Sequence, residues 1–512
     1  MKHKILWADK SDSYFDEFRR YFDRHNFKSY KIESINHFEA YFNSKDYSIV
    51  ITTEKTLKYI GGMESLNPNK TNLIILIDSE DISVLDRLLH LKKVTFLHKS
   101  TSKSNLLVHI KGILFRETNY KQPLANSFYK HFKTLQDEIN SVQTFPEFSS
   151  LYSKLVSFDL DLCSNSQRQQ SNLLEDLFDE ANIRFFKFIR ENYENWLDDS
   201  SHRDFQLSPE IFKNLLLPKL EGQQPHLLIV MDNMCLDQYC LIDLEIKKYF
   251  RRTQLTICCS LLPTTTQYSR NALFSGLYPN EIAQKYPELW VSEMENESKN
   301  NYEKQLMEYF LKENKIGRSL QFWKSSKEED LKRYLKLLDS GLNGIFTLVC
   351  NSLDQLSHQN KQAPVIQNIN SSRDMYRSYS ALWFKNSGLM NIIRRASQLG
   401  YNLTIGTDHG SKRVIKPMGI ISTKNISKNL RYKIGQSMSS NSKNLMRVNE
   451  IKNIKLPQVK INESVLFAGP SYFFTYPNNR KSITKRFQNS LQHGGISLEE
   501  MCIPWANYIP KK

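Results

Sequence analysis

The sequence predicts an α/β protein of several domains, in which a helical region separates two α/β regions. A chain of 512 residues is too long for one core. Short apolar runs alternate with amphipathic stretches in residues 1–120 and 223–512, whereas residues 121–222 show helical spacing alone. Such alternation is typical of parallel sheets covered by helices on both faces. We therefore expect domains at 1–120, 121–222 and 223–512.

The first region carries four apolar runs that we expect to be the strands of a small doubly wound domain. The runs are residues 5–8, 47–51, 73–77 and 94–97, with helical spacing over 14–25 and 82–91. The functional crevice of such a domain lies at the carboxyl ends of its strands.

The middle region repeats apolar residues at helical spacing over residues 127–141, 147–155 and 171–196. Residues 164–170 are polar and indicate a loop. This pattern favours a helical bundle that links the two α/β domains.

The last region resumes the strand pattern, and we expect a second parallel sheet there. Predicted strands cover residues 226–231, 255–261, 344–350 and 402–406, and predicted helices cover 302–313 and 375–399. Residues 420–455 are rich in Ser, Asn and Lys. They indicate an exposed insertion that shapes the pocket.

The amino-acid composition limits the kinds of partner and the cellular compartment that we expect for this protein. The net charge of +16 indicates an anionic partner or substrate, although a general bias towards Lys and Asn explains it as well. The seven cysteines show no metal-knuckle spacing and suit a reducing compartment. The first residues lack the apolar core of a signal peptide, and no run approaches the ~20 apolar residues that span a bilayer. We expect a cytoplasmic protein without membrane insertion.

Metal-ligand residue types follow the strand ends of the last region. They are Asp232, Asp354, His358, Asp408, His409 and His493. Each alone has an ordinary interpretation, as a helix cap, a turn residue or a solvated imidazole. Together they form the mixed nitrogen and oxygen set that zinc prefers. Because carboxyl strand ends meet at one edge of a sheet, we expect these side chains to converge.

A hydroxyl-bearing segment follows the predicted strand at 255–261. It turns at Pro263 and continues as a predicted helix that starts near Thr266 and ends at Gly276 and Pro279. The start of a helix favours negative charge, so a phosphoryl group suits this position. A simple N-cap threonine is the other interpretation of the segment alone.

The order of these elements resembles the alkaline-phosphatase superfamily, and within it the PglZ branch. Related nucleotide pyrophosphatases carry a similar Pro-Thr-x-Thr segment that ends in Gly-Leu-Tyr-Pro, and their second Thr is the nucleophile. That position is Thr266 here. His493 lies in His-Gly-Gly-Ile-Ser-Leu-Glu-Glu-Met, which is similar to the closing signature of the PglZ branch.

The resemblance implies two zinc ions, with manganese as the alternative, and a ligand set for each. One set consists of Asp354, His358 and His493. The other consists of Asp232, Thr266, Asp408 and His409. It further implies that Thr266 attacks phosphorus and that water then hydrolyses a phospho-threonine. Weaker candidates for contacts with substrate phosphate are Arg270, Asn271 and Arg413.

The layout of the whole chain resembles the PorX-type response regulators of Bacteroidota, in which a CheY-like receiver precedes a helical linker and a PglZ domain. A receiver needs an acidic pair, a phosphoacceptor Asp and a Lys. Here Asp9 is followed by Lys10, and Thr53 occupies the phosphoacceptor position, while Lys99 is retained. We expect a pseudo-receiver that has the fold without the phosphorelay.

Two functions are consistent with these features. The first is a two-zinc phosphodiesterase or phosphatase that acts on nucleotides or oligonucleotides; monoester, linear and cyclic dinucleotide substrates stay open. The second is a non-catalytic regulatory or scaffold protein of a two-component or type IX secretion pathway. The PorX-type resemblance implies a sigma factor and a sensor kinase as its partners. Formation of a homodimer through the receiver face also stays open.

Overall fold

The structure is a computed structural model. It describes residues 3–8, 12–25, 27–32, 38, 47–53, 56, 72–77, 94–98, 103, 106–107, 110, 123–164, 171–198, 203–293, 295, 297–339, 344–358, 373–422 and 426–511. The chain forms two compact units. Unit 1 is Met1–Asp137 with Gln169–Leu177, and unit 2 is Glu138–Arg168 with Phe178–Lys512. Within the described part of the chain, every helix is too short or too polar to cross a membrane.

Unit 1 contains a five-stranded parallel sheet in the order β2-β1-β3-β4-β5. Its elements are β1 (His3–Ala8), α1 (Asp12–Arg24), β2 (Phe27–Lys31), β3 (Ile49–Thr53), β4 (Asn72–Ile77) and β5 (Val94–His98). The four predicted strands and the helix at 14–25 are confirmed, and β2 was missed. The order is one of the two common doubly wound orders. The predicted helix at 82–91, Asp9 and Lys99 lie outside the described residues.

Three long helices follow, at the positions that the helical spacing predicts. They are α5 (Pro123–Ser141), α6 (Phe145–Ser164) and α7 (Ser171–Asp198). In unit 2, α6 and α7 pack through aromatic rings, such as the contact of Phe148 with Phe185 at 5.2 Å between ring centroids. Further contacts join Phe145 and Trp196 to Phe205. Ser164 ends α6, and the rest of the predicted loop at 164–170 lies outside the described residues.

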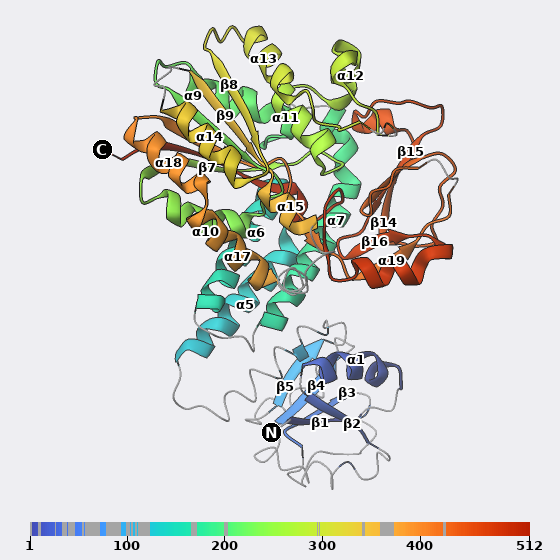
Figure 1. The fold of residues 1–512 in the computed structure, drawn as a ribbon. Coiled ribbons are helices and arrows are strands. Elements are labelled where there is room, and N and C mark those ends of the chain that lie inside the picture. The colour runs from blue at the N-terminus through green and yellow to red at the C-terminus, as the bar shows by residue number, and fades with distance from the viewer. Residues whose placement is uncertain are drawn as a thin grey trace. The chain divides into compact units, whose positions relative to one another are not determined.

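A six-stranded sheet in the order β7-β18-β10-β6-β9-β8 forms the centre of unit 2 (Figure 1). Its strands are β6 (His226–Met231), β7 (Phe250–Cys259), β8 (Leu320–Ser325), β9 (Ile345–Cys350), β10 (Asn402–Gly406) and β18 (Cys502–Pro510). The expectation of a parallel sheet holds in part, because β18 runs antiparallel to both β7 and β10. Strands β10, β6, β9 and β8 are parallel, so their carboxyl ends share one edge.

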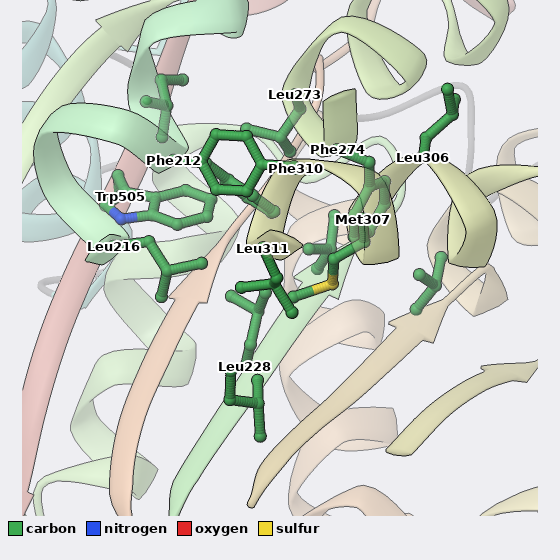
Figure 2. Packing of buried hydrophobic residues seen from close by; sticks show 14 of the residues in the cluster. Phe212, Leu216, Leu228, Leu273, Phe274, Leu306, Met307, Phe310, Leu311 and Trp505 are labelled. Carbon is green, nitrogen blue, oxygen red and sulfur yellow. The ribbon is translucent and has the colours of Figure 1, made fainter. Parts of the chain in front are cut away.

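Helices cover both faces of this sheet. One face packs against α8 (Ser208–Ile211), η5 (Phe212–Leu216), α9 (Leu217–Leu220), α11 (Asn271–Ser275) and α13 (Glu303–Glu313). Figure 2 shows how Phe212, Phe310 and Trp505 meet in this cluster. The other helices of the region are α10 (Leu236–Ile246), α12 (Pro279–Lys285), α14 (Glu328–Leu338), α15 (Ser352–His358), α17 (Arg373–Asn386) and α18 (Gly388–Gln398). The predicted helix at 375–399 is therefore two helices, which separate at Ser387, the N-cap of α18.

Residues 412–492 form a small subdomain beside the large sheet, where β14, β15, β16 and α19 lie together (Figure 1). Its strands are β11 (Lys412–Arg413), β12 (Lys416–Gly419), β13 (Tyr432–Gly435), β14 (Leu445–Val448), β15 (Ser464–Ala468), β16 (Tyr472–Thr475) and β17 (Leu491–Gln492), with α19 at Arg480–Phe487. The expectation of an exposed insertion at 420–455 holds only in part, because buried and exposed residues are mixed over the described part of this stretch. Ile420, Met438 and Phe474 share a buried cluster, and Arg431 is fully buried.

Candidate metal centre

Three potential metal ligands meet where β6 and β10 end. Asp232 follows β6 directly, and Asp408 and His409 follow β10. One ligand atom from each of the three lies within 4.8 Å of the other two, and all three residues are buried. They come together because β6 and β10 are adjacent and parallel, as the strand pattern predicts.

Thr266 lies beside this group. It is the first residue of η6 (Thr266–Arg270), which continues into α11 and ends at Gly276 with a φ of 66°. The Oγ1 atom of Thr266 lies 3.4 Å from Nε2 of His409. The segment therefore places the hydroxyl of Thr266 next to a candidate ligand, at a helix start, where the backbone dipoles favour a negative charge.

Asp354 and His493 form a second group next to the first. Nε2 of His493 lies 3.6 Å from Oδ1 of Asp354. The rings of His493 and His409 are stacked, with centroids 4.4 Å apart. Asn233, which follows Asp232, donates a hydrogen bond of 3.3 Å to Asp354. The two groups thus lie side by side, joined by the stacked rings of His409 and His493.

His358 and Arg413 are placed less completely than the other candidates. His358 is the last residue of α15, and its side chain lies outside the described part of the structure. Its predicted role as a ligand stays a prediction. Arg413 is partly exposed on β11, and its predicted contact with substrate is likewise untested.

Burial shifts the pKa values of Asp232, Asp408 and His409. It raises the pKa of Asp232 to about 7, although the neighbouring Arg270 acts in the opposite direction. Burial also raises the pKa of Asp408 to about 6 and lowers that of His409. Desolvation of a carboxylate is costly unless a cation or hydrogen bonds compensate it.

Two buried carboxylate oxygens show that the site suits a cation. Among the described residues, Oδ1 of Asp232 and Oδ2 of Asp408 have no hydrogen-bond partner. Nε2 of His409 lies 3.6 Å from each of these two atoms. Such unsatisfied buried oxygens are rare in folded proteins and call for an explanation. A divalent ion bound by the two carboxylates and the imidazole satisfies both, so the residues fit zinc.

The contacts of Arg270 differ from the substrate contact that the sequence suggests. It is fully buried, and its Nη1 atom lies 2.7 Å from Oδ2 of Asp232. Its Nε atom donates a 2.7 Å hydrogen bond to Glu303. The structure therefore does not support Arg270 as a contact for substrate phosphate. We infer that Arg270 instead positions Asp232, because it holds one oxygen of that carboxylate, while the other oxygen has no hydrogen-bond partner among the described residues.

Asn271 also turns away from the site. Its Nδ2 atom donates hydrogen bonds to the backbone oxygens of Gln267 and Lys299, and the side chain is buried. The structure does not support it as a substrate contact. Glu303, in contrast, was missed, because the first residue of an ordinary amphipathic helix carries no motif.

We expect Arg270→Met to weaken zinc binding about tenfold to a hundredfold, the usual effect of losing a partner of a metal ligand. It should also destabilise the fold by roughly 3–5 kcal/mol, because Glu303 is left buried and partly unpaired. The double variant Arg270→Met/Glu303→Met removes both charges of that pair and should recover part of the lost stability, because Asp232 and Lys324 each still lack an ion-pair partner, but it should not recover the zinc affinity. Calorimetric zinc titration and thermal unfolding separate the two effects. Wild-type zinc affinity in Arg270→Met would contradict the positioning role.

Two protein families match parts of this chain. Residues 211–508 match the family of the BREX system PglZ alkaline phosphatase-like domain, and residues 120–197 match the PorX response regulator linker domain. A search of curated proteins finds no match.

Solved structures that resemble the chain include a phosphonoacetate hydrolase from Sinorhizobium meliloti 1021 in two complexes. The complex with phosphonoformate is 12% identical, with a TM-score of 0.37 over 56% of this chain and 90% of that chain. The complex with phosphonoacetate is 11% identical, with a TM-score of 0.34 over the same shares. Because the PglZ match spans more than half of the residues, the chain belongs to the PglZ family of alkaline phosphatase-like domains, in the PorX-type arrangement with the PorX linker ahead of that domain.

Proposed function

We propose that this chain is a metal-dependent phosphoesterase with Thr266 as its nucleophile. The observation that carries the proposal is the position of the Thr266 hydroxyl, 3.4 Å from His409, at the edge of a buried group with two unsatisfied carboxylate oxygens. A hydroxyl, an anion-favouring helix start and an ion site in one place are what phosphoryl transfer needs.

The residues present suit two zinc ions, with manganese as the alternative. Asp232, Thr266, Asp408 and His409 would hold one ion. Asp354, His358 and His493 would hold the other. When bound, the ions supply positive charge that lowers the pKa of a nearby hydroxyl and stabilises phosphate oxygens.

The chain's own groups then perform a double displacement. Oγ1 of Thr266 loses its proton and forms a bond to phosphorus, while the bond between phosphorus and the ester oxygen breaks and the alcohol leaves with a proton. Water next attacks the phospho-threonine. Its oxygen binds phosphorus, the bond from phosphorus to Oγ1 breaks, and the hydroxyl is restored. The N–H groups at the start of η6 face the developing negative charge.

Nucleotides or oligonucleotides are the proposed substrates. The net charge of +16 attracts polyanions, and the resemblance to nucleotide pyrophosphatases favours a phosphodiester. To test the proposal, the purified full chain loaded with zinc is incubated with bis-nitrophenyl phosphate, nitrophenyl phosphate and short dinucleotides. We expect zinc-dependent release of nitrophenol or mononucleotides. If the zinc-loaded chain hydrolyses none of these esters, the proposal is overturned.

A regulatory role is the second candidate, and the five-stranded parallel sheet of unit 1 favours it. Its order, β2-β1-β3-β4-β5, is that of doubly wound domains such as CheY. Thr53 ends β3, at the position proposed for a phosphoacceptor, and a threonine hydroxyl cannot form an acyl phosphate. We therefore propose a pseudo-receiver that binds a sigma factor, a sensor kinase or a second copy of the chain. Tight association with such a partner, without any phosphoesterase activity, would favour this role alone.

A further inference from the structure

His493 lies on a tightly packed turn. The turn His493-Gly494-Gly495 follows β17, and Gly494 has a φ of 112°, which side chains other than glycine rarely adopt. A Cβ atom on Gly494 would lie 2.8 Å from the ring of Tyr432, and one on Gly495 would lie 2.7 Å from Nη2 of Arg431. The small subdomain therefore packs directly against the backbone that carries a candidate metal ligand.

An ion pair supports the turn from one side. Glu500 and Arg431 are both fully buried. Oε2 of Glu500 accepts a 2.7 Å hydrogen bond from Nη2 of Arg431, and Oε1 accepts one of 3.1 Å from Nε. The same Oε1 accepts a 2.9 Å hydrogen bond from the backbone N–H of Gly495. The carboxylate thus joins the guanidinium to the turn.

Arg431 is in turn fixed by the subdomain. Its Nη1 atom donates hydrogen bonds to the backbone oxygens of Gly469 and Tyr472. Its planar group therefore satisfies two carbonyls and one carboxylate at once, a pattern that lysine cannot reproduce.

Thr264 supports the turn from the nucleophile segment. Its Oγ1 atom accepts a 3.0 Å hydrogen bond from the N–H of Gly494 and donates one of 2.9 Å to the carbonyl of Gly495. Its own carbonyl lies 3.3 Å from Nδ1 of His493. The turn is thus clamped between the segment that leads to Thr266 and the Arg431–Glu500 pair.

We propose that Arg431 and Glu500 are a positioning pair that fixes His493 for metal binding, so that the small subdomain completes the metal centre. The inference rests on the proposed function. Two fully buried opposite charges are often no more stabilising than apolar residues of similar volume, so stability alone does not account for them. A metal ligand, however, must be held within about 0.5 Å, and partners of ligands supply that precision.

The test compares Arg431→Met with Arg203→Met. Arg203 forms an ion pair with Glu210 in unit 2, in which the Arg203 side chain is buried and the Glu210 side chain is partly exposed, and neither residue contacts the turn among the described contacts. Both variants should lose stability. We expect only Arg431→Met to lose zinc, from about two ions to about one per chain, with affinity at the weaker position lowered about tenfold or more. Equal zinc content and affinity in the two variants would overturn the inference.

Two further variants keep the test informative if Arg431→Met does not fold. Arg431→Lys keeps the positive charge but loses the paired N–H donors of the planar guanidinium. Glu500→Gln keeps the shape of the side chain but loses its negative charge. Each should weaken zinc binding at the second position while thermal unfolding stays cooperative. Unchanged zinc binding in both variants refutes the inference.

The wild-type measurement separates the positioning pair from the proposed function. A wild-type chain that binds neither zinc nor manganese contradicts the proposed function. A wild type and an Arg431→Met variant that each bind two zinc ions with equal affinity contradict only the positioning pair.

Discussion

Replacing Thr266 with alanine should lower phosphoester hydrolysis by roughly ten-thousandfold or more, the scale seen when a nucleophile is removed. The cause is chemical, because alanine offers no oxygen to phosphorus. Zinc should still bind, since Asp232, Asp408 and His409 remain within 4.8 Å of one another. The free energy of unfolding should change by less than about 1 kcal/mol, because Thr266 is only half-buried. Steady-state kinetics, zinc analysis and thermal unfolding measure the three quantities.

Neighbouring variants control for indirect effects. Thr266→Ser restores a hydroxyl and should recover much of the rate, whereas Thr265→Ala removes the adjacent hydroxyl and should leave the rate near that of the wild type. Acid quenching during turnover should trap phosphate on Thr266, detectable by mass spectrometry of the peptide. Full activity in zinc-loaded Thr266→Ala would show that another group attacks phosphorus.

Removal of metal should abolish turnover, and the strength of metal binding should depend steeply on pH. Asp232 has a pKa of about 7 and Asp408 of about 6 in the metal-free protein because both are buried. Below these values protons compete with the ion for the same oxygens. Zinc affinity should therefore fall by about tenfold per pH unit for each proton displaced, as pH decreases from 7 to 5. Calorimetric titration in zinc buffers at several pH values measures this slope.

The raised pKa values of these carboxyl groups also determine whether the metal-free protein becomes more or less stable as pH rises. An unfolded Asp loses its proton near ~3.9, whereas the folded metal-free protein keeps one on Asp232 up to about pH 7. The folded state thus binds more protons in this window, so the free energy of unfolding of the metal-free protein should fall as pH rises from about 4 to about 7. Zinc should raise the melting temperature more at pH 7.5 than at pH 5.5. A chelated protein that is free of metal yet still active would contradict the metal-dependent reaction.

The elements that the sequence predicts best are those with continuous apolar runs. β6 and β10 were predicted with their observed bounds, and they bring Asp232 and Asp408 together. Several of the strands that were missed carry polar residues or proline, although β15, with Val-Leu-Phe-Ala, was missed as well. β2 is Phe-Lys-Ser-Tyr-Lys, and β18 contains Pro504, which argues against a strand in the interior of a sheet. Pairing with partners distant in sequence stabilises these strands, and local patterns do not encode it.

The same limit explains the small subdomain and the role of Arg270. Residues 420–455 are polar by composition, yet Arg431 and Lys433 are buried, because Glu500 and backbone carbonyls satisfy their charges. Arg270 was a weaker candidate for a substrate contact, and its pairing with Glu303 was not foreseen because Glu303 lies 33 residues away and has no motif. Ligand types at strand ends could be found from the sequence, but the groups that hold the ligands could not.

The late position of β18 has a consequence for biosynthesis. Among the strands described, β7 pairs only with β18, and β18 also joins it to β10. A nascent chain that has emerged from the ribosome up to residue 501 already carries every proposed ligand from Asp232 to His493, but β7 and β10 still have unpaired edges. Such edges invite association with other chains. Completion of the sheet that carries the candidate metal centre therefore waits for β18, and chaperone capture of ribosome-bound intermediates should be strongest just before Cys502 emerges.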